Sequence, residues 1–251
     1  NDTTNFLNHP TSWATCNTNY AKITVNSPSV VYVGGVVGYA GRGSGLGSAF
    51  QRCKNGGDIE VISPADNSCV GGIYGYQNRG LLGNANGYGQ ASDKVSIKVT
   101  GATSNTYVGA YVGWMYSDHG KASDHWYTMR LSGCSVYGSI DADGATAGVL
   151  AGRLQWAGKS TTNCLMLGSG STELPRVSKS FTLNDVKVGD LLDAGTHTVN
   201  TFFGLISPSN DAAMTHIGPD GVAMKGRYLF FVAGNKTTPA ASYMDGLLFV
   251  D

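Results

Sequence analysis

The sequence has few charged residues, and the two signs cancel. Asp, Glu, Lys and Arg make up 14% of its 251 residues, with 17 basic residues against 17 acidic ones. Soluble domains usually carry roughly 25% charged residues. A chain without net charge has no field to attract phosphate backbones or anionic lipids, so we expect neither nucleic acid nor a bulk membrane surface as its partner.

Long apolar runs are missing as well. None approaches the roughly 18 to 20 residues that cross a bilayer, and no basic segment followed by an apolar one opens the chain. We therefore expect no membrane span. The chain begins at Asn1 rather than at Met, which favours a processed, exported protein.

Cysteine is scarce and odd in number. Five cysteines cannot form a complete set of disulfides within one chain. The sequence has no Cys-x-x-Cys pair, so neither a zinc nor an iron site is expected. Its Gly-x-Gly segments are not followed by the Lys-Ser/Thr of a phosphate loop. We expect no cofactor.

Glycine, in contrast, is abundant, with 36 residues, and so is Tyr, with 13. Many of the glycines belong to one seven-residue phrase, Val33-Gly34-Gly35-Val36-Val37-Gly38-Tyr39, which recurs three times. The later copies begin at Val70, Val108 and Ala147, so the spacings are 37, 38 and 39 residues. A fixed period of this size indicates a repeat architecture in which each unit stacks on the next.

Two further landmarks mark each repeat. An alternating apolar pair, typical of a half-buried strand, precedes each phrase. These pairs are Ile23 and Val25, Ile59 and Val61, Ile97 and Val99, and Ile140 and Ala142. Upstream of each pair stands a small residue, giving the column Cys16, Cys53, Ala91 and Cys134, with Cys164 opening a fifth repeat. We interpret the thiols as a buried, inert stack at an inward position.

The second repeat carries a resemblance to a known family. Its segment Cys53-Lys54-Asn55-Gly56-Gly57-Asp58-Ile59, followed by Val70-Gly71-Gly72-Ile73-Tyr74-Gly75-Tyr76, resembles the GLUG-type repeat of bacterial surface proteins. That pattern runs Cys-x-Asn-x-Gly-x-Ile/Val and then Val-Gly-Gly-Leu-Val-Gly. The first copy here lacks the Gly before its Ile, and the fourth has no aromatic residue after Gly152. The resemblance covers about residues 16–170.

The resemblance implies a fold and a location rather than an activity. The fold it implies is all-β, a right-handed parallel β-solenoid of about four to five turns, in exported and often adhesin-like proteins. It brings no catalytic residue with it. We divide the chain into an N-terminal segment that caps the repeats (1–20), the solenoid repeats (21–170) and a β-rich C-terminal module (171–251). Four or five apolar strands predict that this module is an antiparallel cap or a small β-sandwich.

Irregular arcs separate each phrase from the next cysteine position. We expect all four arcs to leave the solenoid on one side, where repeat proteins commonly bind. The ligand-binding candidates are Tyr88, Tyr116, Asp118, His119, Asp124, His125, Trp126 and Trp156. Aromatic rings beside fixed hydrogen-bonding groups suit a glycan or a protein receptor. The doubled Ser-Asp-His of the third arc has no standard metal-site spacing, so we interpret it as a hydrogen-bonded loop network and expect no metal.

Catalytic constellations are missing from the repeats. Solenoids that cleave polysaccharides gather carboxylates in one groove, whereas Asp58, Asp93 and Asp141 stand at different repeat positions. The Gly-Ser-Gly triplets at Gly43 and Gly168 have no partners for a nucleophile elbow. We therefore expect a protein that is not an enzyme.

These expectations combine into one leading hypothesis and two alternatives. The leading one is a non-enzymatic extracellular surface protein, on a cell, an appendage or a virion, that mediates adhesion or receptor binding through its arcs. The first alternative is a phage receptor-binding tip or a filament subunit that self-associates through its C-terminal strands. The second is a polysaccharide-degrading β-solenoid enzyme.

Overall fold

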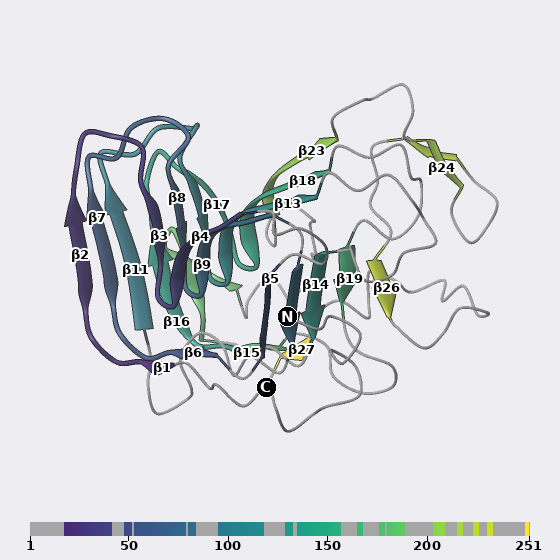
Figure 1. Ribbon diagram of the computed structural model, residues 1–251, viewed down its shortest axis with the longest axis horizontal. Coiled ribbons are helices and arrows are strands. Elements are labelled where there is room, and N and C mark those ends of the chain that lie inside the picture. The colour runs from purple at the N-terminus through teal and green to yellow at the C-terminus, as the bar shows by residue number, and fades with distance from the viewer. Residues whose placement is uncertain are drawn as a thin grey trace.

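The described part of the chain is all-β. The computed structural model describes residues 18–41, 48–51, 53–78, 80–83, 95–117, 129–132, 135–156, 165–167, 176–178, 180–188, 203–208, 215–217, 223–225, 230–232 and 249–250. Most of these residues lie in short strands that pair in parallel (Figure 1). Within these ranges there is no helix long and apolar enough to cross a membrane.

The isoleucine sheet contains the alternating apolar pairs. Its strands are β2 (Ile23–Asn26), β7 (Ile59–Ile62), β11 (Val95–Thr100), β16 (Gly138–Asp141), β21 (Thr182–Leu183) and β22 (Val186–Lys187), in that order. Ile97 pairs with Ile59 on one side and with Ile140 on the other. Like residues of successive repeats thus stack on one another, as the repeat period predicts.

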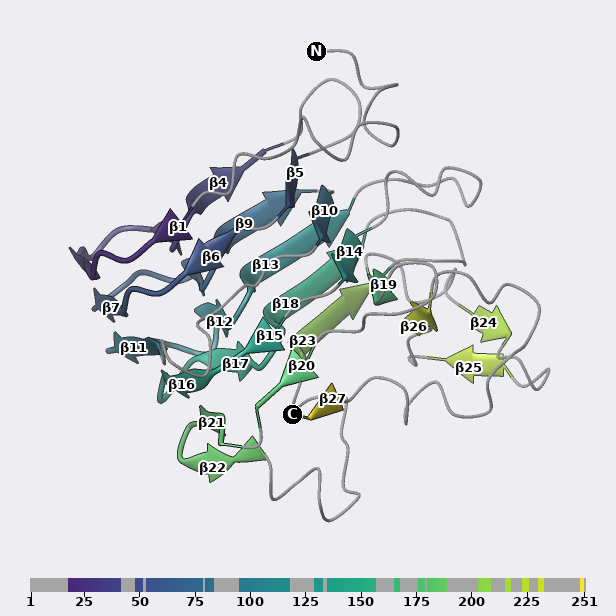
Figure 2. The ribbon, with the colours of Figure 1, turned by 90° about the horizontal axis from the view of Figure 1, so that it is seen from below.

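The glycine sheet and the aromatic sheet share the recurring phrase. The glycine sheet consists of β3 (Tyr32–Gly34), β8 (Cys69–Gly71), β12 (Tyr107–Gly109) and β17 (Thr146–Gly148). The aromatic sheet consists of β4 (Val37–Ala40), β9 (Tyr74–Asn78), β13 (Val112–Ser117), β18 (Ala151–Trp156) and β23 (Phe203–Pro208). Figure 2 shows the strands of the aromatic sheet side by side in chain order. Each phrase therefore turns from one sheet into the next.

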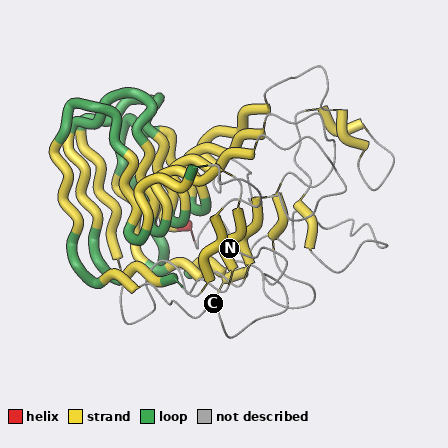
Figure 3. The backbone as a smooth tube through the Cα atoms, viewed as in Figure 1, coloured by secondary structure: helices red, strands yellow, loops and turns green. Residues whose placement is uncertain are grey.

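The leucine sheet lies beyond the aromatic sheet along each repeat. It contains β5 (Ser48–Gln51), β10 (Gly80–Gly83), β14 (Met129–Ser132), β19 (Leu165–Leu167) and β26 (Phe230–Val232). Shorter parallel pairs join β1 (Thr18–Asn19) to β6 (Lys54–Asn55) and link β15 (Ser135–Val136), β20 (Arg176–Val177) and β27 (Phe249–Val250). The described turns that connect the isoleucine and glycine sheets gather at one end of the strands (Figure 3).

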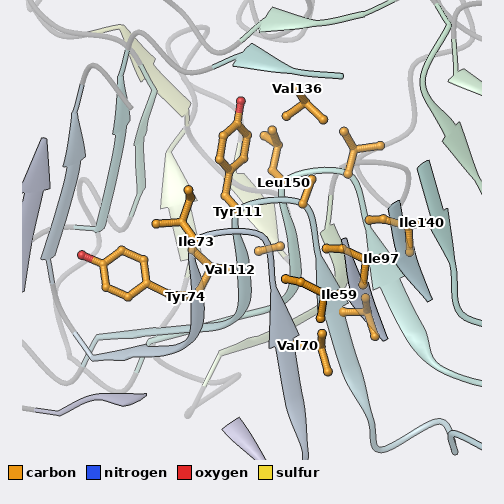
Figure 4. Close-up of a cluster of buried hydrophobic side chains, with 14 of the residues drawn as sticks. Ile59, Val70, Ile73, Tyr74, Ile97, Tyr111, Val112, Val136, Ile140 and Leu150 are labelled. Carbon is orange, nitrogen blue, oxygen red and sulfur yellow. The ribbon is translucent and has the colours of Figure 1, made fainter. Parts of the chain in front are cut away.

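Aliphatic side chains of the isoleucine and glycine sheets form the core. Ile59, Ile97 and Ile140 are almost completely buried, and so are Val70 and Val108 of the facing sheet. Figure 4 shows Ile59, Ile97 and Ile140 in a row, one from each successive strand. Since every repeat contributes the same residue type at the same height, each one buries its apolar face against its neighbours.

Glycines in the phrase let the glycine and aromatic sheets approach backbone to backbone. A Cβ on Gly113 would lie 2.5 Å from the amide nitrogen of Val70 and 2.6 Å from the carbonyl oxygen of Gly75. A Cβ on Gly71 would lie 2.0 Å from the carbonyl oxygen of Tyr74. No side chain fits there, because these contacts are with backbone atoms that cannot move aside.

The C-terminal third corrects one expectation. β20, β21, β23, β26 and β27 pair in parallel with strands of the preceding repeat. Among the described residues, antiparallel pairing occurs only between β21 and β22 and between β24 (Thr215–Ile217) and β25 (Ala223–Lys225). The expected antiparallel arrangement is thus found in two short pairs only. Backbone hydrogen bonds carry the stacking onward even where the phrase has decayed to Phe203-Gly204-Leu205.

The cysteine column needs a correction too. Cys53 is buried as expected, while Cys16, Ala91, Cys134 and Cys164 lie outside the described residues. Asn19 pairs with Asn55, just as Ile23 pairs with Ile59. The corner between these positions therefore has the same length in both repeats. The alignment of Cys16 with Cys53 assumes one extra residue between them and the isoleucine pair; the described residues 19–23 do not contain it, and the position of Cys16 itself stays a prediction.

Candidate functional site

One face of the aromatic sheet carries aromatic and amide side chains. Strand residues alternate between faces, and the inward set, Ala40, Gln77, Met115 and Leu154, is buried. The outward set forms two rows across the strands. Tyr39, Tyr76, Trp114, Arg153 and Leu205 make the first row, and Asn78, Tyr116 and Gln155 make the second. Each repeat thus presents equivalent outward positions.

Two tyrosines from the glycine sheet complete this face. The ring centroid of Tyr32 lies 5.1 Å from that of Tyr39 and 5.9 Å from that of Tyr76, and both contacts are edge to face. The ring of Tyr107 meets that of Trp114 at 5.5 Å in the same manner. The aromatic surface, as we name it, consists of Tyr32, Tyr39, Tyr76, Tyr107, Trp114 and Tyr116, together with Asn78, Arg153 and Gln155. Both sheets contribute to it because the phrase bends sharply between them.

The rings contact one another continuously. Tyr39 and Tyr76 are stacked at 4.9 Å with an angle of 7° between their planes. The ring centroids of Tyr76 and Trp114 lie 5.4 Å apart, with the two rings edge to face. The ring centroid of Tyr116 lies 6.5 Å from that of Tyr76 and 6.5 Å from that of Trp114. Such offset and edge-to-face pairs add to the stability gained from burial alone, so the rings hold each other in place.

Arg153 follows Trp114 in the first row, at a position where the three preceding strands carry an aromatic residue. Its guanidinium carbon lies 4.1 Å from the ring centroid of Trp114 and 5.0 Å from that of Tyr107. One of its amino groups also donates a hydrogen bond of 3.1 Å to the hydroxyl of Tyr107. A guanidinium over an aromatic face is attracted by the ring quadrupole. Arg153 therefore fixes the orientation of Trp114 as well as contributing charge.

Three polar atoms of the aromatic surface are buried without a hydrogen-bond partner among the described residues. They are Oδ1 of Asn78, Oε1 of Gln155 and Nε1 of Trp114. Asn78 and Gln155 lie on either side of Tyr116 in the second row. Most buried polar atoms in proteins are hydrogen-bonded, so three unpaired atoms on one surface indicate that a ligand supplies the missing hydrogen bonds.

Burial raises the pKa of two acidic groups at this surface, Tyr76 and Cys69. Burial is the main cause that raises the pKa of Tyr76, and the neighbouring phenols Tyr39 and Tyr116 raise it further. Burial also raises the pKa of Cys69 to about 12, against a smaller opposite effect of Arg153. Cys69 pairs with Tyr32 on one side and Tyr107 on the other. At neutral pH the thiol is therefore not a nucleophile, and Arg153 carries the charge of this surface.

The structure describes two of the residues that the sequence singled out. Tyr116 belongs to the aromatic surface. Trp156 ends β18 and pairs with Ser117 and Pro208. The remaining candidates lie outside the described residues: Tyr88, Asp118, His119, Asp124, His125 and Trp126. Sequence reasoning missed Tyr39, Tyr76 and Trp114, although each stands at the end of a glycine phrase and that position was visible.

The arcs do not all begin at the same place. In the first, third and fourth repeats, the segment between the aromatic and leucine strands is long, running over 41–47, 118–128 and 157–164. In the second repeat, β9 and β10 are separated by residue 79 alone, and the long segment 84–94 follows β10 instead. The expectation of a common origin is wrong for this repeat. Leu81 and Leu82 pair with neighbours on both sides, so this part of the expected arc is a strand.

The described residues show no candidate metal centre. No group of three or more His, Cys, Asp or Glu side chains in these ranges is placed to hold a metal ion. With the geometry established, comparison with other proteins adds nothing further. No protein-family model, no curated protein and no solved structure matches the chain.

Proposed function

We propose that the chain is a non-enzymatic extracellular surface protein that binds a glycan or a protein receptor. The observation that carries this proposal is the aromatic surface, where Tyr39 is 57% exposed and Tyr32 39% exposed. Large aromatic side chains with polar ends are enriched where proteins bind, because each offers apolar area and a hydrogen-bonding group. Adhesion is the function that suits such a surface on a repeat scaffold.

The scaffold we propose for this function is a right-handed parallel β-solenoid of the GLUG type. Its support is that the isoleucine, glycine and aromatic sheets take one strand from each successive repeat, in parallel and in chain order. Parallel crossovers in one sheet are right-handed in about 98% of cases. The location on a cell, appendage or virion exterior follows from the GLUG-type resemblance and remains part of the proposal.

Two of the arcs contribute to binding in this proposal. The segments 118–128 and 157–164 follow β13 and β18, whose outward residues Trp114, Tyr116 and Arg153 belong to the aromatic surface. The candidates Asp118, His119, Asp124, His125, Trp126 and Trp156 therefore lie a few residues along the chain from that surface. Tyr88 belongs to the segment after β10 and is the weakest candidate of the group.

Binding of the labelled full chain to cells and to a glycan array tests this function. We expect saturable binding that Trp126→Ala and Trp156→Ala weaken. A chain that binds no cell type and no glycan would overturn the proposal. Incubation with a panel of polysaccharides tests the enzymatic alternative: we expect no release of reducing ends, whereas release would favour a polysaccharide-degrading solenoid.

Self-association is a second candidate function, and β27 favours it. This strand, Phe249–Val250, pairs in parallel with β20 and forms the edge of its sheet among the described strands. A further strand from another copy would continue the same pattern. The solution mass at high concentration decides it, since a strict monomer would contradict a filament subunit or a virion appendage.

A further inference from the structure

The second row of the aromatic surface combines amide groups with rings. Asn78, Tyr116 and Gln155 occupy equivalent positions of three adjacent strands, directly beside Tyr76, Trp114 and Arg153. Adjacent strands lie about 4.7–4.9 Å apart. A ligand that runs across the strands therefore meets aromatic rings in the first three repeats and amide groups in the second and fourth.

The unpartnered atoms define what such a ligand must offer. Oδ1 of Asn78 and Oε1 of Gln155 are acceptors that lack donors, and Nε1 of Trp114 is a donor that lacks an acceptor. Rotation about the terminal torsion of an amide is soft, so either oxygen turns outward easily. The ligand must therefore donate and accept hydrogen bonds within one short stretch, which a hydroxyl group does.

The unpaired amide oxygens argue against purely anionic ligands. Arg153 is the charged side chain among the nine of this surface, and its guanidinium already contacts Trp114 and Tyr107. A deprotonated carboxylate or phosphate group has no proton to donate, so it leaves the acceptor oxygens of the two amides unpaired. A purely apolar partner would leave the amide oxygens unpaired, which is costly for a buried group.

We infer that the aromatic surface binds a neutral oligosaccharide, laid across the strands of the aromatic sheet. This inference rests on the proposed function and names its ligand class. The sugar hydroxyls satisfy Asn78, Gln155 and the indole of Trp114, while the C–H groups of the sugar rings pack against the partly exposed phenols of Tyr39 and Tyr32. A protein receptor on this surface is the competing outcome.

Asn78→Leu is the most informative variant. Leu keeps the branched shape of Asn78, with two methyl groups in place of the amide oxygen and nitrogen, and removes a buried oxygen that has no partner, so the folded state should be about as stable as before. Binding should weaken at least tenfold, because the same oxygen accepts a hydrogen bond from the sugar. If Asn78→Leu weakens binding without lowering the free energy of unfolding, Asn78 has a binding role. If the variant lowers both, the role of Asn78 is structural.

Tyr39→Ala and Tyr20→Ala form a matched pair. Both tyrosines are exposed, at 57% and 65%, but Tyr20 lies away from the aromatic surface, beside Lys54. Isothermal titration with cellohexaose, maltohexaose and mannohexaose is the measurement, with polygalacturonate as the anionic comparison. We expect Tyr39→Ala to weaken binding at least fivefold and Tyr20→Ala to leave it unchanged.

Each outcome decides a separate question. Loss of hexaose binding in Asn78→Leu and Tyr39→Ala, with Tyr20→Ala unaffected, supports the inference. It is overturned if the wild-type chain binds none of the three hexaoses, if both surface variants bind normally, or if polygalacturonate binds more tightly. A chain that still adheres to cells, but whose adhesion Asn78→Leu does not change, retains the proposed function and loses only the inferred ligand class.

Discussion

The phenol rings of Tyr39 and Tyr76 stack with centroids 4.9 Å apart and planes 7° from parallel. They stand 37 residues apart in the sequence and are brought together by the pairing of β4 with β9. The pairing of β9 with β13 places Tyr76 beside Trp114 in the next strand. The row of rings is thus a product of backbone register, and whatever disturbs the register should disturb the row.

Gly113→Ala should destabilise the fold by about 3 kcal/mol or more. The new methyl group would meet three backbone atoms within 2.9 Å, and overpacking of this kind typically costs 1–3 kcal/mol even where side chains can yield. Urea unfolding followed by circular dichroism measures the change. Thr100→Ala, at an exposed position of β11, is the control and should stay within about 0.5 kcal/mol. Equal stability of the two variants would contradict the tight approach of the sheets.

Ile97→Ala should cost about 2–5 kcal/mol and Ile97→Val about 0.5–1.5 kcal/mol. Ile97 is completely buried between Ile59 and Ile140, so truncation leaves a cavity that neither neighbour can fill without leaving its own repeat. Chemical denaturation of both variants gives the comparison. A loss below 1 kcal/mol for Ile97→Ala would show that this column is not part of the core.

Asp66 should make stability depend on acid pH. Hydrogen bonds from Thr103 and then Asn105 lower its folded-state pKa below the ordinary value of 3.8. The folded state binds this proton less readily than the unfolded state, so its contribution is present above pH 3.8 and is lost as the pH falls through the lowered pKa.

Thermal melts between pH 2 and 6 measure the effect of Asp66. We expect Asp66→Asn to flatten the acid limb of the stability profile. Thr103→Val, which removes one donor, should flatten it in part. Thr100→Ala, which changes no ionisable group, should leave the profile as in the wild type. A profile that Asp66→Asn does not change would contradict the role of these hydrogen bonds.

Cys69 should resist thiol reagents in the folded protein. Burial raises its pKa to about 12, and the thiolate is the reactive species. Maleimide labelling at pH 8, followed by peptide mapping, should modify Cys69 at least tenfold more slowly than a cysteine introduced by Thr100→Cys. After unfolding in urea, both sites should label at similar rates. Rapid labelling of Cys69 in the native protein would mean that the Tyr32 side of the surface opens to solvent.

The register of the first four repeats was predictable because two signals coincide. The phrase and the apolar pair recur at nearly equal spacing, so Ile59, Ile97 and Ile140 had to align once the period was recognised. The parallel pairing of β23 was not predictable in the same way. Only Gly204 of its phrase survives opposite Gly152, and backbone hydrogen bonds need no particular side chain.

The aromatic surface was missed because alternation does not say which face of a strand is exposed. Tyr39 and Ala40 stand on opposite faces by their sequence positions alone, yet a tyrosine is as suitable for a core as an alanine. Tyr74 and Tyr111 are in fact buried. Tyr39 is more exposed than Tyr76 and Trp114 because its strand, β4, lies at the edge of the aromatic sheet among the described strands. The sequence favours the arcs as the binding site because their length and composition vary between repeats, but most of their residues lie outside the described ranges.

The row that begins at Tyr39 changes its chemistry as it proceeds. A phenol is followed by a second phenol, an indole, a guanidinium and finally the aliphatic side chain of Leu205. The two ends of the row are therefore chemically different. A chain molecule whose own two ends differ should lie on it in one orientation only, so that the protein distinguishes the direction of its ligand as well as its composition.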